Sequence, residues 1–500
     1  MNRTERLSRL LRVLAAIVAE PGLNPLELAE RVGTSERTLR RDLAELREMG
    51  YDVAYTSGYE VQEKLDLEGG RRGRSRTPMA EKQLELLHAV AEAVGAADLW
   101  KGLDQPEPGQ APRRRTAPRK PKAGASMPTL LIAGGGPDAE FVYGTGFEVE
   151  GGVYIRFPDG DDVLAVNGLE IDRARAQASA ARTLDRPTVR SGDYGGCARV
   201  AAELLLEKGF GHARVSPRLQ AGYLEALRAE GIEVEIDEAL FLDERRRKSA
   251  KEADAIQESQ RAAEAAVVAA VRELARAEIR DGILWLEGSP LTSERLYARA
   301  QLALGELGFT CPDMIIAGSP GSAMPHYRGE GPIAANAPVI LDIFPSSRAT
   351  HYFGDLTRTV VVGEVSEEVR KMHAAVLQAL EAGVEAIAEG VPGRDVNATV
   401  CQVLVDRGYG ASTVGFEPPP GVAFMNHSTG HGVGLDVHEK PELRGPSKDV
   451  LREGDVVTVE PGLYRLELGG VRIEDTGMVT KTGFRNFTTL TRSLDPRDYV

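Results

Sequence analysis

The stretch "PVILDIFP" (338–345) and the stretch "HYFGDLTRTVVVG" (351–363) follow each other closely along the chain. Asp342 stands at the end of an apolar strand pattern, and Asp355 stands at the start of the next. A buried carboxylate without a partner is costly, so an acid at the end of a buried strand indicates that a partner is present. Because a short connection can bring both carboxylates to one point, the sequence predicts an acidic site on a β-hairpin.

A second pair of strand patterns repeats this arrangement nearer the C-terminus. The segment "DVVTVEPGLY" supplies Glu460, and the segment "GVRIEDTGMV" supplies Glu474. Between the two pairs lies the glycine-rich "STGHGVGLDVHE", where the backbone freedom of glycine lets the imidazole of His431 point inward. We therefore expect the side chains of both hairpins and this histidine to meet.

Four carboxylates and one imidazole form an oxygen-rich ligand set. Such a set fits two hard or borderline divalent ions, with Mn²⁺ or Co²⁺ preferred and Zn²⁺ or Fe²⁺ as alternatives, because a structural Zn²⁺ favours Cys and His. Two ions would share bridging carboxylates and a bridging water whose pKa they lower, which gives hydroxide at neutral pH. The predicted metal ligands are Asp342, Asp355, His431, Glu460 and Glu474.

The length and composition of the chain limit what else the protein can be. Five hundred residues exceed one compact core, so two or three domains are expected. No apolar run reaches membrane-spanning length, and Arg12 interrupts the first apolar stretch, so neither a membrane span nor a secretory signal is expected. Three scattered cysteines fit a reducing cytoplasm and supply neither a disulfide framework nor a thiolate metal site.

Charge is shared unevenly along the chain, whose formal net charge is −14. Basic residues outnumber acidic ones in residues 1–126, whereas acidic residues prevail in residues 127–500. An acidic surface repels nucleic acid, so any contact with DNA is expected from the N-terminal part.

Patterns of composition divide the chain into four segments. The first has the pattern of three helices and a hairpin, and the second holds one more helix and a linker rich in Pro, Arg and Lys, which cannot bury a core. In the third, strand patterns alternate with helical ones, which is α/β order. In the fourth, a long helix precedes two comparable stretches, each a helix followed by strands. The segments are residues 1–63, 64–126, 127–245 and 246–500.

The α/β order of the third segment depends on short apolar runs. The strand patterns lie at 129–133, 152–157, 163–166 and 232–236, and the helical patterns lie at 174–183, 198–208 and 218–229. The long helix that opens the fourth segment is expected over 250–279.

The first segment has the features of a helix-turn-helix. Asn24 is expected to cap a helix that has Pro25 in its first turn. Gly33 then makes a tight turn, and Ser35 caps a third helix that carries several arginines. The run "SERTLRRDLAELREMGYDV" resembles the winged helix-turn-helix of the DeoR-type and related bacterial regulators. The residues expected to contact DNA are Ser35, Arg37, Thr38, Arg40 and Arg41.

The same residues also fit a small helical domain that does not bind DNA. Its arginines would then pair with neighbouring acids such as Glu36 and Asp42. Residues 1–50 have little net positive charge, so their attraction to a phosphate backbone is weak unless the basic stretch 113–122 assists. Both interpretations of the first segment stay open.

The blocks around the five ligands resemble those of a known family. The segments "LDIF…GDLTRT", "STGHGVGLDVHE", "VEPGLY" and "GVRIED" are similar to the signature blocks of the M24 "pita-bread" metallopeptidases, on the branch of Xaa-Pro aminopeptidases and prolidases. The resemblance covers roughly residues 128–490 and includes "DAEFVYGTGF" and "KSAKEADAIQESQRAAEAA". It implies a multi-domain protein in which the mostly α winged helix-turn-helix precedes an α/β creatinase/prolidase-type domain and then an α+β pita-bread catalytic domain.

The resemblance also implies a role for each metal ligand. Asp342 would chelate one ion, and Asp355 and Glu474 would bridge both ions. His431 and Glu460 would complete the second ion. Glu460 would also move a proton from the attacking water to the leaving proline nitrogen, acting first as a general base and then as an acid.

Four further residues match positions around the substrate in this family. His326 matches a histidine on the substrate side, and His427 matches one that lines the pocket. His438 matches the histidine that contacts the scissile carbonyl and stabilises the tetrahedral oxyanion, and Arg472 matches an arginine near the site. As alternatives, His326 and His438 could form hydrogen bonds without a catalytic role, and Arg472 could pair with one of the acids at 474 and 475.

Two intervals depart from the family's pattern. The segment between Asp342 and Asp355 is slightly longer than usual, and the interval between His326 and Asp342 is slightly shorter. Both changes lie around the substrate pocket, so they bear on the choice of substrate more than on metal binding.

The function predicted from the sequence is that of a cytoplasmic, homodimeric dinuclear-metal exopeptidase that cleaves Xaa-Pro bonds in proline-containing peptides by attack of a metal-bridged hydroxide. A proline nitrogen lacks N–H and fixes the chain, so a pocket shaped for the proline ring is expected. An Xaa-Pro aminopeptidase and an Xaa-Pro dipeptidase are equally compatible with the residues. The alternative is a DNA-binding transcriptional regulator whose pita-bread domain senses a peptide or a metal, although the complete ligand set argues against an inactive site.

Overall fold

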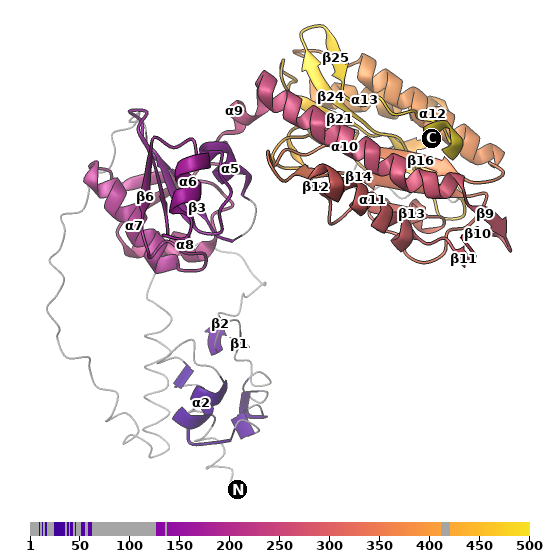
Figure 1. Ribbon diagram of the computed structural model, residues 1–500. Helices are drawn as coiled ribbons and strands as arrows, with labels where there is room; N and C mark the ends of the chain where they lie inside the picture. The colour runs from indigo at the N-terminus through magenta and orange to yellow at the C-terminus, as the bar shows by residue number, and fades with distance from the viewer. Residues whose placement is uncertain are drawn as a thin grey trace, which may run out of the picture. The chain divides into compact units, whose positions relative to one another are not determined.

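A computed structural model describes residues 127–135, 138–411 and 421–500, with single positions and short segments between residues 10 and 62 (Figure 1). The chain forms two units, Met1–Arg115 and Thr116–Val500. Within the described residues, no helix is long and apolar enough to cross a membrane.

The described residues of the first unit form helix α2 (Pro25–Arg31) and an antiparallel hairpin of β1 (Asp52–Tyr55) and β2 (Tyr59–Gln62). Gly33 makes the turn after α2 with a φ of 66°, in the left-handed region that glycine adopts at little cost. The helix start, the turn and the hairpin are therefore as predicted. A small apolar core joins α2 to residues that precede and follow it, and it comprises Leu10, Val13, Ile17, Leu28, Ala29, Val32, Leu39, Leu43 and Leu46.

Ser35 has the hydrogen bonds of a helix cap. Its Oγ accepts from Thr38 N at 3.3 Å, and its carbonyl oxygen accepts from Leu39 N at 2.9 Å. The cap predicted at Ser35 is confirmed, whereas the cap predicted at Asn24 and the whole of segment 64–126 lie outside the described residues.

The second unit begins with a six-stranded sheet in the order β6-β5-β4-β3-β7-β8. The central pairs β3–β4 and β4–β5 are antiparallel, whereas the outer pairs are parallel. The strands are β3 (Thr129–Ala133), β4 (Gly152–Arg156), β5 (Asp162–Val166), β6 (Arg182–Asp185), β7 (His212–Val215) and β8 (Glu233–Ile236).

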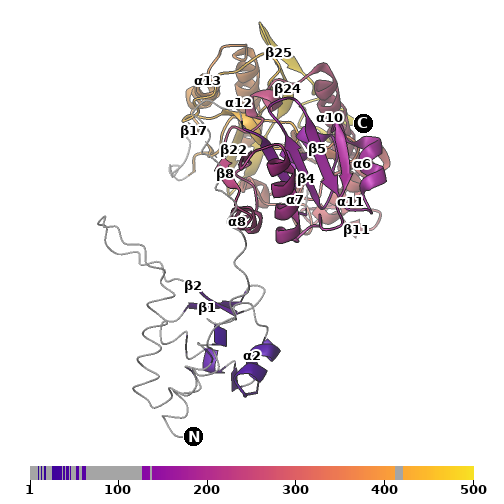
Figure 2. The same cartoon turned by 90° about the vertical axis from the view of Figure 1, so that its left-hand side faces the viewer.

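Helices cover both faces of this sheet, because successive side chains of a strand point to opposite sides. Leu130 and Ile132 of β3 pack with α7 and α8, whereas Leu131 between them packs with α5 and α6. The second view of the molecule shows α7 crossing the strands (Figure 2). The four helices are α5 (Ala139–Thr145), α6 (Ile171–Gln177), α7 (Tyr194–Glu207) and α8 (Ala221–Ala229).

The sequence prediction is wrong at the ends of two helices. The helix expected over 174–183 ends at Gln177, and its last predicted residues belong to β6. The long helix expected over 250–279 ends at Ala275 and is followed by β9 (Glu278–Arg280). Both missed strands have half-buried or exposed side chains, so neither has the apolar run by which a strand is recognised.

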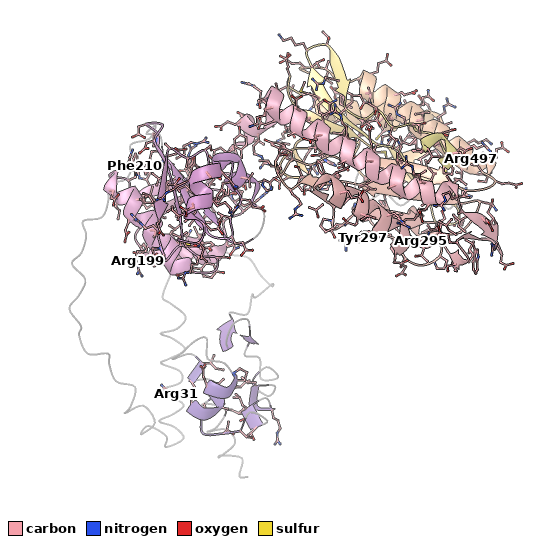
Figure 3. All side chains as sticks on the ribbon, in the orientation of Figure 1. Arg31, Arg199, Phe210, Arg295, Tyr297 and Arg497 are labelled. Atoms are coloured by element: carbon pink, nitrogen blue, oxygen red, sulfur yellow. The ribbon has the colours of Figure 1, made fainter. Side chains whose placement is uncertain are left out.

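Two pairs of helices pack on the strands of residues 246–500. One core joins α10 and α11 to β14 (Pro338–Ile343) and β16 (Leu356–Val361). Another joins α12 and α13 to β21 (Val456–Val459), β22 (Gly462–Arg465) and β23 (Gly469–Arg472). Within the first pair, Arg295 of α11, which is labelled in Figure 3, donates to Glu273 of α10 at 2.8 Å. The helices are α9 (Leu242–Arg246), α10 (Ala250–Ala275), α11 (Ser293–Leu307), α12 (Glu367–Glu385) and α13 (Gly393–Asp406).

Three antiparallel sheet segments carry the site. β13 (Ile315–Gly318), β14 (Pro338–Ile343) and β16 (Leu356–Val361) form the first. The second has the order β20-β19-β21-β24-β25, and β18, β22 and β23 run antiparallel in the third. Their bounds are β18 (Phe424–Met425), β19 (Gly430–Gly432), β20 (Glu439–Leu443), β21 (Val456–Val459), β22 (Gly462–Arg465), β23 (Gly469–Arg472), β24 (Asp475–Thr480) and β25 (Gly483–Asn486).

Short strands complete the second unit. A three-stranded edge sheet has the order β11-β10-β9, β12 pairs with β15 and β17 pairs with β18. They are β10 (Ile283–Leu286), β11 (Ser289–Pro290), β12 (Phe309–Thr310), β15 (Ser346–Ser347) and β17 (Gly410–Ala411).

Candidate metal centre

Two pairs of antiparallel strands place four acids at corresponding positions. Asp342 lies near the end of β14, opposite Thr357 of β16, and Asp355 immediately precedes β16. Glu460 follows β21, and Glu474 immediately precedes β24, which pairs with β21. The antiparallel pair that the sequence predicted for the first two acids is therefore present. The second pair is not the simple hairpin that was predicted, because β22 and β23 form a hairpin between its two strands.

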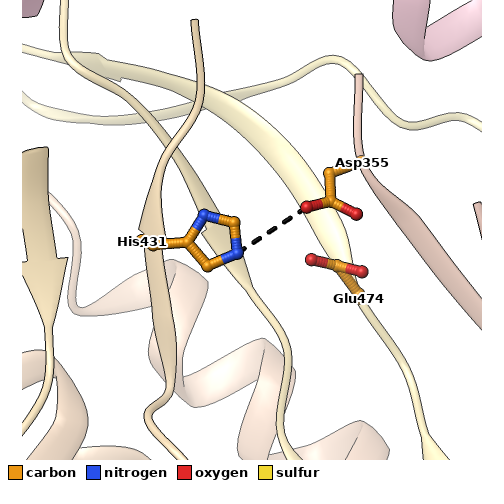
Figure 4. Close-up of side chains that lie close together, drawn as sticks. All are labelled: Asp355, His431 and Glu474. Atoms are coloured by element: carbon orange, nitrogen blue, oxygen red, sulfur yellow. Dashed lines mark ion pairs between the residues drawn. The ribbon is translucent and has the colours of Figure 1, made fainter. Parts of the chain in front are cut away.

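The histidine between the hairpins points at these acids. Nε2 of His431 lies 3.4 Å from Glu460 Oε1 and 3.6 Å from Asp355 Oδ2. Ligand atoms of Asp355, His431 and Glu474 all lie within 4.8 Å of one another (Figure 4). Nδ1 of His431 lies 3.2 Å from the carbonyl oxygen of Gly432, which can only accept, so Nδ1 carries the proton and Nε2 is free to bind a cation.

Neighbouring polar groups fix the orientation of the acids. Thr357 Oγ1 donates to Glu474 Oε2 at 2.8 Å, and Glu474 N donates to the carbonyl oxygen of Thr357 at 3.1 Å. Asp355 is held through its backbone, because Gln260 of α10 accepts from Asp355 N and donates to its carbonyl oxygen, each at 2.8 Å. These contacts leave the Asp355 carboxylate free to face His431.

Arg472 is the cation of the cluster and pairs with the fourth acid. Its Nη2 donates to Asp342 Oδ2 at 2.5 Å, and its Nη1 donates to the hydroxyl of Tyr464 at 2.9 Å. The sequence allowed a pairing with the acids at 474 or 475 instead. Asp475 pairs with Arg358 at 2.9 Å, which leaves Arg472 to the ligand set.

Burial and mutual repulsion change the protonation of these groups. Burial, followed by the charges of neighbouring carboxylates, raises the pKa of Asp355 and of Glu474 well above the usual range. Burial also raises the pKa of Glu460 to about 8, although Arg472 opposes this shift. Burial lowers the pKa of His431 to about 3, so its imidazole is neutral. A neutral imidazole among carboxylates that repel one another is a donor set that fits divalent cations.

The predicted histidines line one cavity together with the acids. The cavity has a volume of about 840 Å³ and contains His326, His427 and His438 in its wall. The ring centroid of His438 lies 4.1 Å from that of His431 with the rings near perpendicular, and burial lowers the pKa of His438. His438 therefore stands neutral beside His431 in the wall of the cavity.

Both ring nitrogens of His427 are engaged within the protein. Nδ1 lies 2.8 Å from the carbonyl oxygen of Ser428 and therefore donates, so Nε2 accepts from the hydroxyl of Tyr464 at 2.8 Å. A hydrogen-bond chain thus runs from Arg472 through Tyr464 to His427. Burial is the main cause that lowers the pKa of His427 to about 4.

Several residues that shape the site were not singled out in the sequence. Tyr464 and Thr357 lie inside the quoted motifs, but a hydroxyl on a strand gives no pattern of its own. Arg358 is fully buried and donates to Glu474 O at 2.6 Å and to Thr357 O at 2.9 Å. A charged residue in the apolar run that follows Asp355 was the available signal, because buried arginines are rare unless paired.

The structure describes three of the five residues that were expected to contact DNA. Ser35 and Arg41 are exposed and Thr38 is half-buried, whereas Arg37 and Arg40 lie outside the described residues. The Oγ of Ser35 and the Oγ1 of Thr38 lie 3.0 Å apart.

Known proteins match this chain in sequence and in structure. Residues 254–481 match the metallopeptidase family M24, and residues 7–60 match a helix-turn-helix domain. An Xaa-Pro dipeptidase of Pyrococcus horikoshii is 32% identical over 285 residues, which are 56% of this chain and 74% of that protein. An Xaa-Pro dipeptidase of Pyrococcus furiosus is 37% identical over 36% of this chain, and the match spans only about half (49%) of its length.

Solved structures of such proteins have the same fold. The prolidase of Pyrococcus horikoshii OT3 superposes with a TM-score of 0.61 at 27% identity, over 74% of this chain and 95% of its own. The prolidase of Pyrococcus furiosus gives 0.59 at 26% identity, over 73% and 97%. An X-Pro aminopeptidase of Thermotoga maritima gives 0.61 at 24% identity, over 73% and 96%, so proteins with both names share this fold.

Proposed function

The chain belongs to metallopeptidase family M24, as its sequence motifs predicted, and from this premise we propose that it is an exopeptidase that hydrolyses Xaa-Pro bonds in peptides. The observation that carries the proposal is the meeting of Asp355, His431 and Glu474 within 4.8 Å in the wall of a cavity. Asp342 and Glu460 line the same cavity, so all five predicted ligands lie in its wall.

The residues present would hold two divalent ions. Asp342 would bind one ion, His431 and Glu460 would bind the other, and Asp355 and Glu474 would bind both. Ions held in this way lower the pKa of a water molecule that they share and so supply the nucleophile. Their positive charge would also oppose the burial and the carboxylate repulsion that together raise the pKa of Asp355 and of Glu474. We propose Mn²⁺ or Co²⁺ as the working ions, because the donor set is mostly oxygen.

Glu460 is proposed as the residue that moves the proton. Its Oε1 lies 3.4 Å from His431, and its side chain faces the cavity in which the peptide would lie. The carboxylate accepts a proton from the attacking water and then donates it to the proline nitrogen, which leaves as a secondary amine. The proton is needed because an amide nitrogen is a poor leaving group until it is protonated.

His438 and His326 are proposed to hold the substrate carbonyl. Burial lowers the pKa of His438, so its neutral ring can donate one N–H to the scissile carbonyl oxygen as negative charge develops there. His326 lies in the same cavity wall, on the segment between β13 and β14. His427 supports the wall through Tyr464 instead of contributing a free ring nitrogen.

A comparison of three peptides tests the proposal. The full chain, stripped with EDTA and reloaded with Mn²⁺, is incubated with alanyl-proline, alanyl-prolyl-alanine and, as the matched control without the ring, alanyl-alanine. Cleavage of the proline dipeptide identifies a dipeptidase, and formation of prolyl-alanine together with alanine from the tripeptide identifies an aminopeptidase. If neither proline peptide is cleaved faster than alanyl-alanine, the proposed function is wrong.

The match of residues 7–60 to a helix-turn-helix domain favours a second function, sequence-specific DNA binding. Arg41 is exposed in the part of this domain that the structure describes, as a residue that contacts phosphate must be. Selection of duplexes from a random pool by the full chain, followed by a mobility-shift assay with Arg41→Ala, tests this function. DNA binding is supported if one sequence is enriched and the Arg41→Ala variant binds it more weakly. It is contradicted if the recovered duplexes are as random as the starting pool.

A further inference from the structure

The segment that carries His438 is held from outside the region that carries the metal ligands. We call residues 434–439 the His438 segment. Leu435 of this segment packs against Ala139 and Val142 of α5. Its two acids, Asp436 and Glu439, pair with cations that precede the region matching the peptidase family. The α/β half of the second unit and its connecting helix therefore support the segment.

Arg245 of α9 bridges the two acids that flank His438. Its Nη2 donates to Asp436 Oδ2 at 2.8 Å and to Glu439 Oε2 at 2.5 Å. The side chain is only 10% exposed, so these charged hydrogen bonds are largely shielded from water. One guanidinium thus fixes the chain on both sides of the histidine.

Two further cations, Arg218 and Lys248, also pair with these acids, and we call the three cations the clamp. Nη1 of Arg218 donates to both carboxylate oxygens of Asp436, at 2.9 and 3.0 Å, but its side chain is 51% exposed. Nζ of Lys248 donates to Glu439 Oε1 at 2.6 Å with 1% of its side chain exposed. Arg218 and Lys248 each pair with one acid of the His438 segment, whereas Arg245 pairs with both.

The clamp holds the backbone on both sides of His438, whose ring lies next to the candidate metal ligand His431. The His438 ring lies 4.1 Å from the ring of the ligand His431 and shares its cavity. A rotation of the His438 backbone would move this ring away from the scissile carbonyl, and small displacements of a catalytic group cost much activity. Glu140 of α5 lies 3.8 Å from Arg245 Nη1, so the α/β half also contacts the clamp directly.

We propose that Arg245 is a positioning residue that fixes His438 beside the metal centre and so couples the α/β half of the second unit to catalysis. The catalytic part of this inference rests on the proposed peptidase function. The positioning part does not, because it concerns the order of the His438 segment in the chain itself.

The test compares Arg245→Ala and Arg245→Lys with the full-length wild type. Arg228→Ala is the matched control, because Arg228 is 54% exposed and pairs with Glu225 within α8. Hydrogen exchange followed by mass spectrometry on metal-free protein is expected to show faster exchange in the His438 segment of Arg245→Ala, by about 10-fold or more, with β14 unchanged. The Lys variant should fall between the two, because an ammonium can keep one of the two contacts.

With Mn²⁺ and alanyl-proline, kcat of Arg245→Ala should fall by about 10- to 100-fold, while KM changes little and the bound metal stays constant. Unchanged exchange in the His438 segment would overturn the positioning role, and so would a loss of metal together with kcat. If the wild type cleaves no Xaa-Pro peptide, the proposed function fails, but the exchange measurement still decides whether Arg245 orders the segment. A Lys variant no better than the Ala variant in exchange would also contradict the bridging geometry.

Discussion

Arg472 and Asp342 form an ion pair of 2.5 Å inside a cluster of buried carboxylates. Arg472 is 4% exposed, and its Nε also donates to Thr357 Oγ1 at 3.2 Å, so it occupies the centre of the site and not its rim. In the absence of metal, its positive charge offsets part of the electrostatic repulsion among these carboxylates. The pair therefore supports the ligand set before any metal binds.

Replacement of Arg472 by Met should destabilise the metal-free protein more than the metal-loaded protein. Removing one partner of a buried ion pair costs about 3–5 kcal/mol, because the other charge stays buried without compensation. Bound metal would supply that compensation. Thermal unfolding in EDTA and in Mn²⁺ measures the difference.

Arg452→Met is the control for this experiment. Arg452 pairs with Asp243 at 2.6 Å, but both side chains are well exposed at 43% and 78%. An exposed pair contributes about 0–1 kcal/mol, so the control should unfold nearly as the wild type does in both buffers. Equal unfolding temperatures for both variants in EDTA would contradict the role given to Arg472.

The stability contributed by neutral His427 should depend on pH. Burial lowers its pKa to about 4 from an ordinary value of 6.5. Between these values the unfolded chain binds a proton that the folded chain does not, so stability is lost as pH falls from 6.5 towards 4. In His427→Gln the residue cannot titrate. The wild type should therefore exceed the variant in unfolding temperature most clearly at pH 7, with a smaller difference at pH 5, and a difference that grows on acidification would be inconsistent with a buried neutral ring.

Gly329, three residues after His326 in the sequence, has no room for a side chain. Its φ is +87°, and a Cβ would stand 1.9 Å from the carbonyl oxygen of Ile316. Gly331 also has a positive φ, of +68°, but a Cβ there would meet nothing within 4 Å. We expect Gly331→Ala to cost about 1 kcal/mol from backbone strain and Gly329→Ala to cost about 3 kcal/mol or more because the backbone must also move. Chemical denaturation of both variants gives these values, and similar costs would show that the clash is relieved without movement.

Prediction from sequence succeeded where residues stand at the ends of buried strands. Asp342 and Asp355 were placed correctly on neighbouring strands because apolar residues lead up to Asp342 in β14 and recur after Asp355 in β16. The edge strand β6 was missed because its side chains face solvent. Contacts between distant segments, such as Arg245 with Asp436 and Glu439, have no local pattern, since they depend on how the two halves of the unit meet.

The five candidate metal ligands could be named from the sequence, but the hydrogen bonds around them could not. The chain from Arg472 through Tyr464 to His427 joins residues of three separate segments. His427 was predicted to line the pocket, as it does, but the engagement of both its ring nitrogens could not be predicted. Such hydrogen-bond partners are decided by three-dimensional packing, because a hydroxyl or an imidazole can donate to or accept from many different groups.

The measurement that tests the central claim most directly is the metal content and peptidase activity of Asp355→Asn beside the wild type. Asp172→Asn is the control, because Asp172 has a side chain that is 95% exposed. After EDTA treatment and dialysis against Mn²⁺, the wild type and the control should bind about two ions per chain and cleave an Xaa-Pro peptide. Asp355→Asn should bind fewer ions and lose activity by about 100-fold or more, because an amide is a poorer and uncharged ligand. Retention of both the metal and the activity by Asp355→Asn would contradict the site described above.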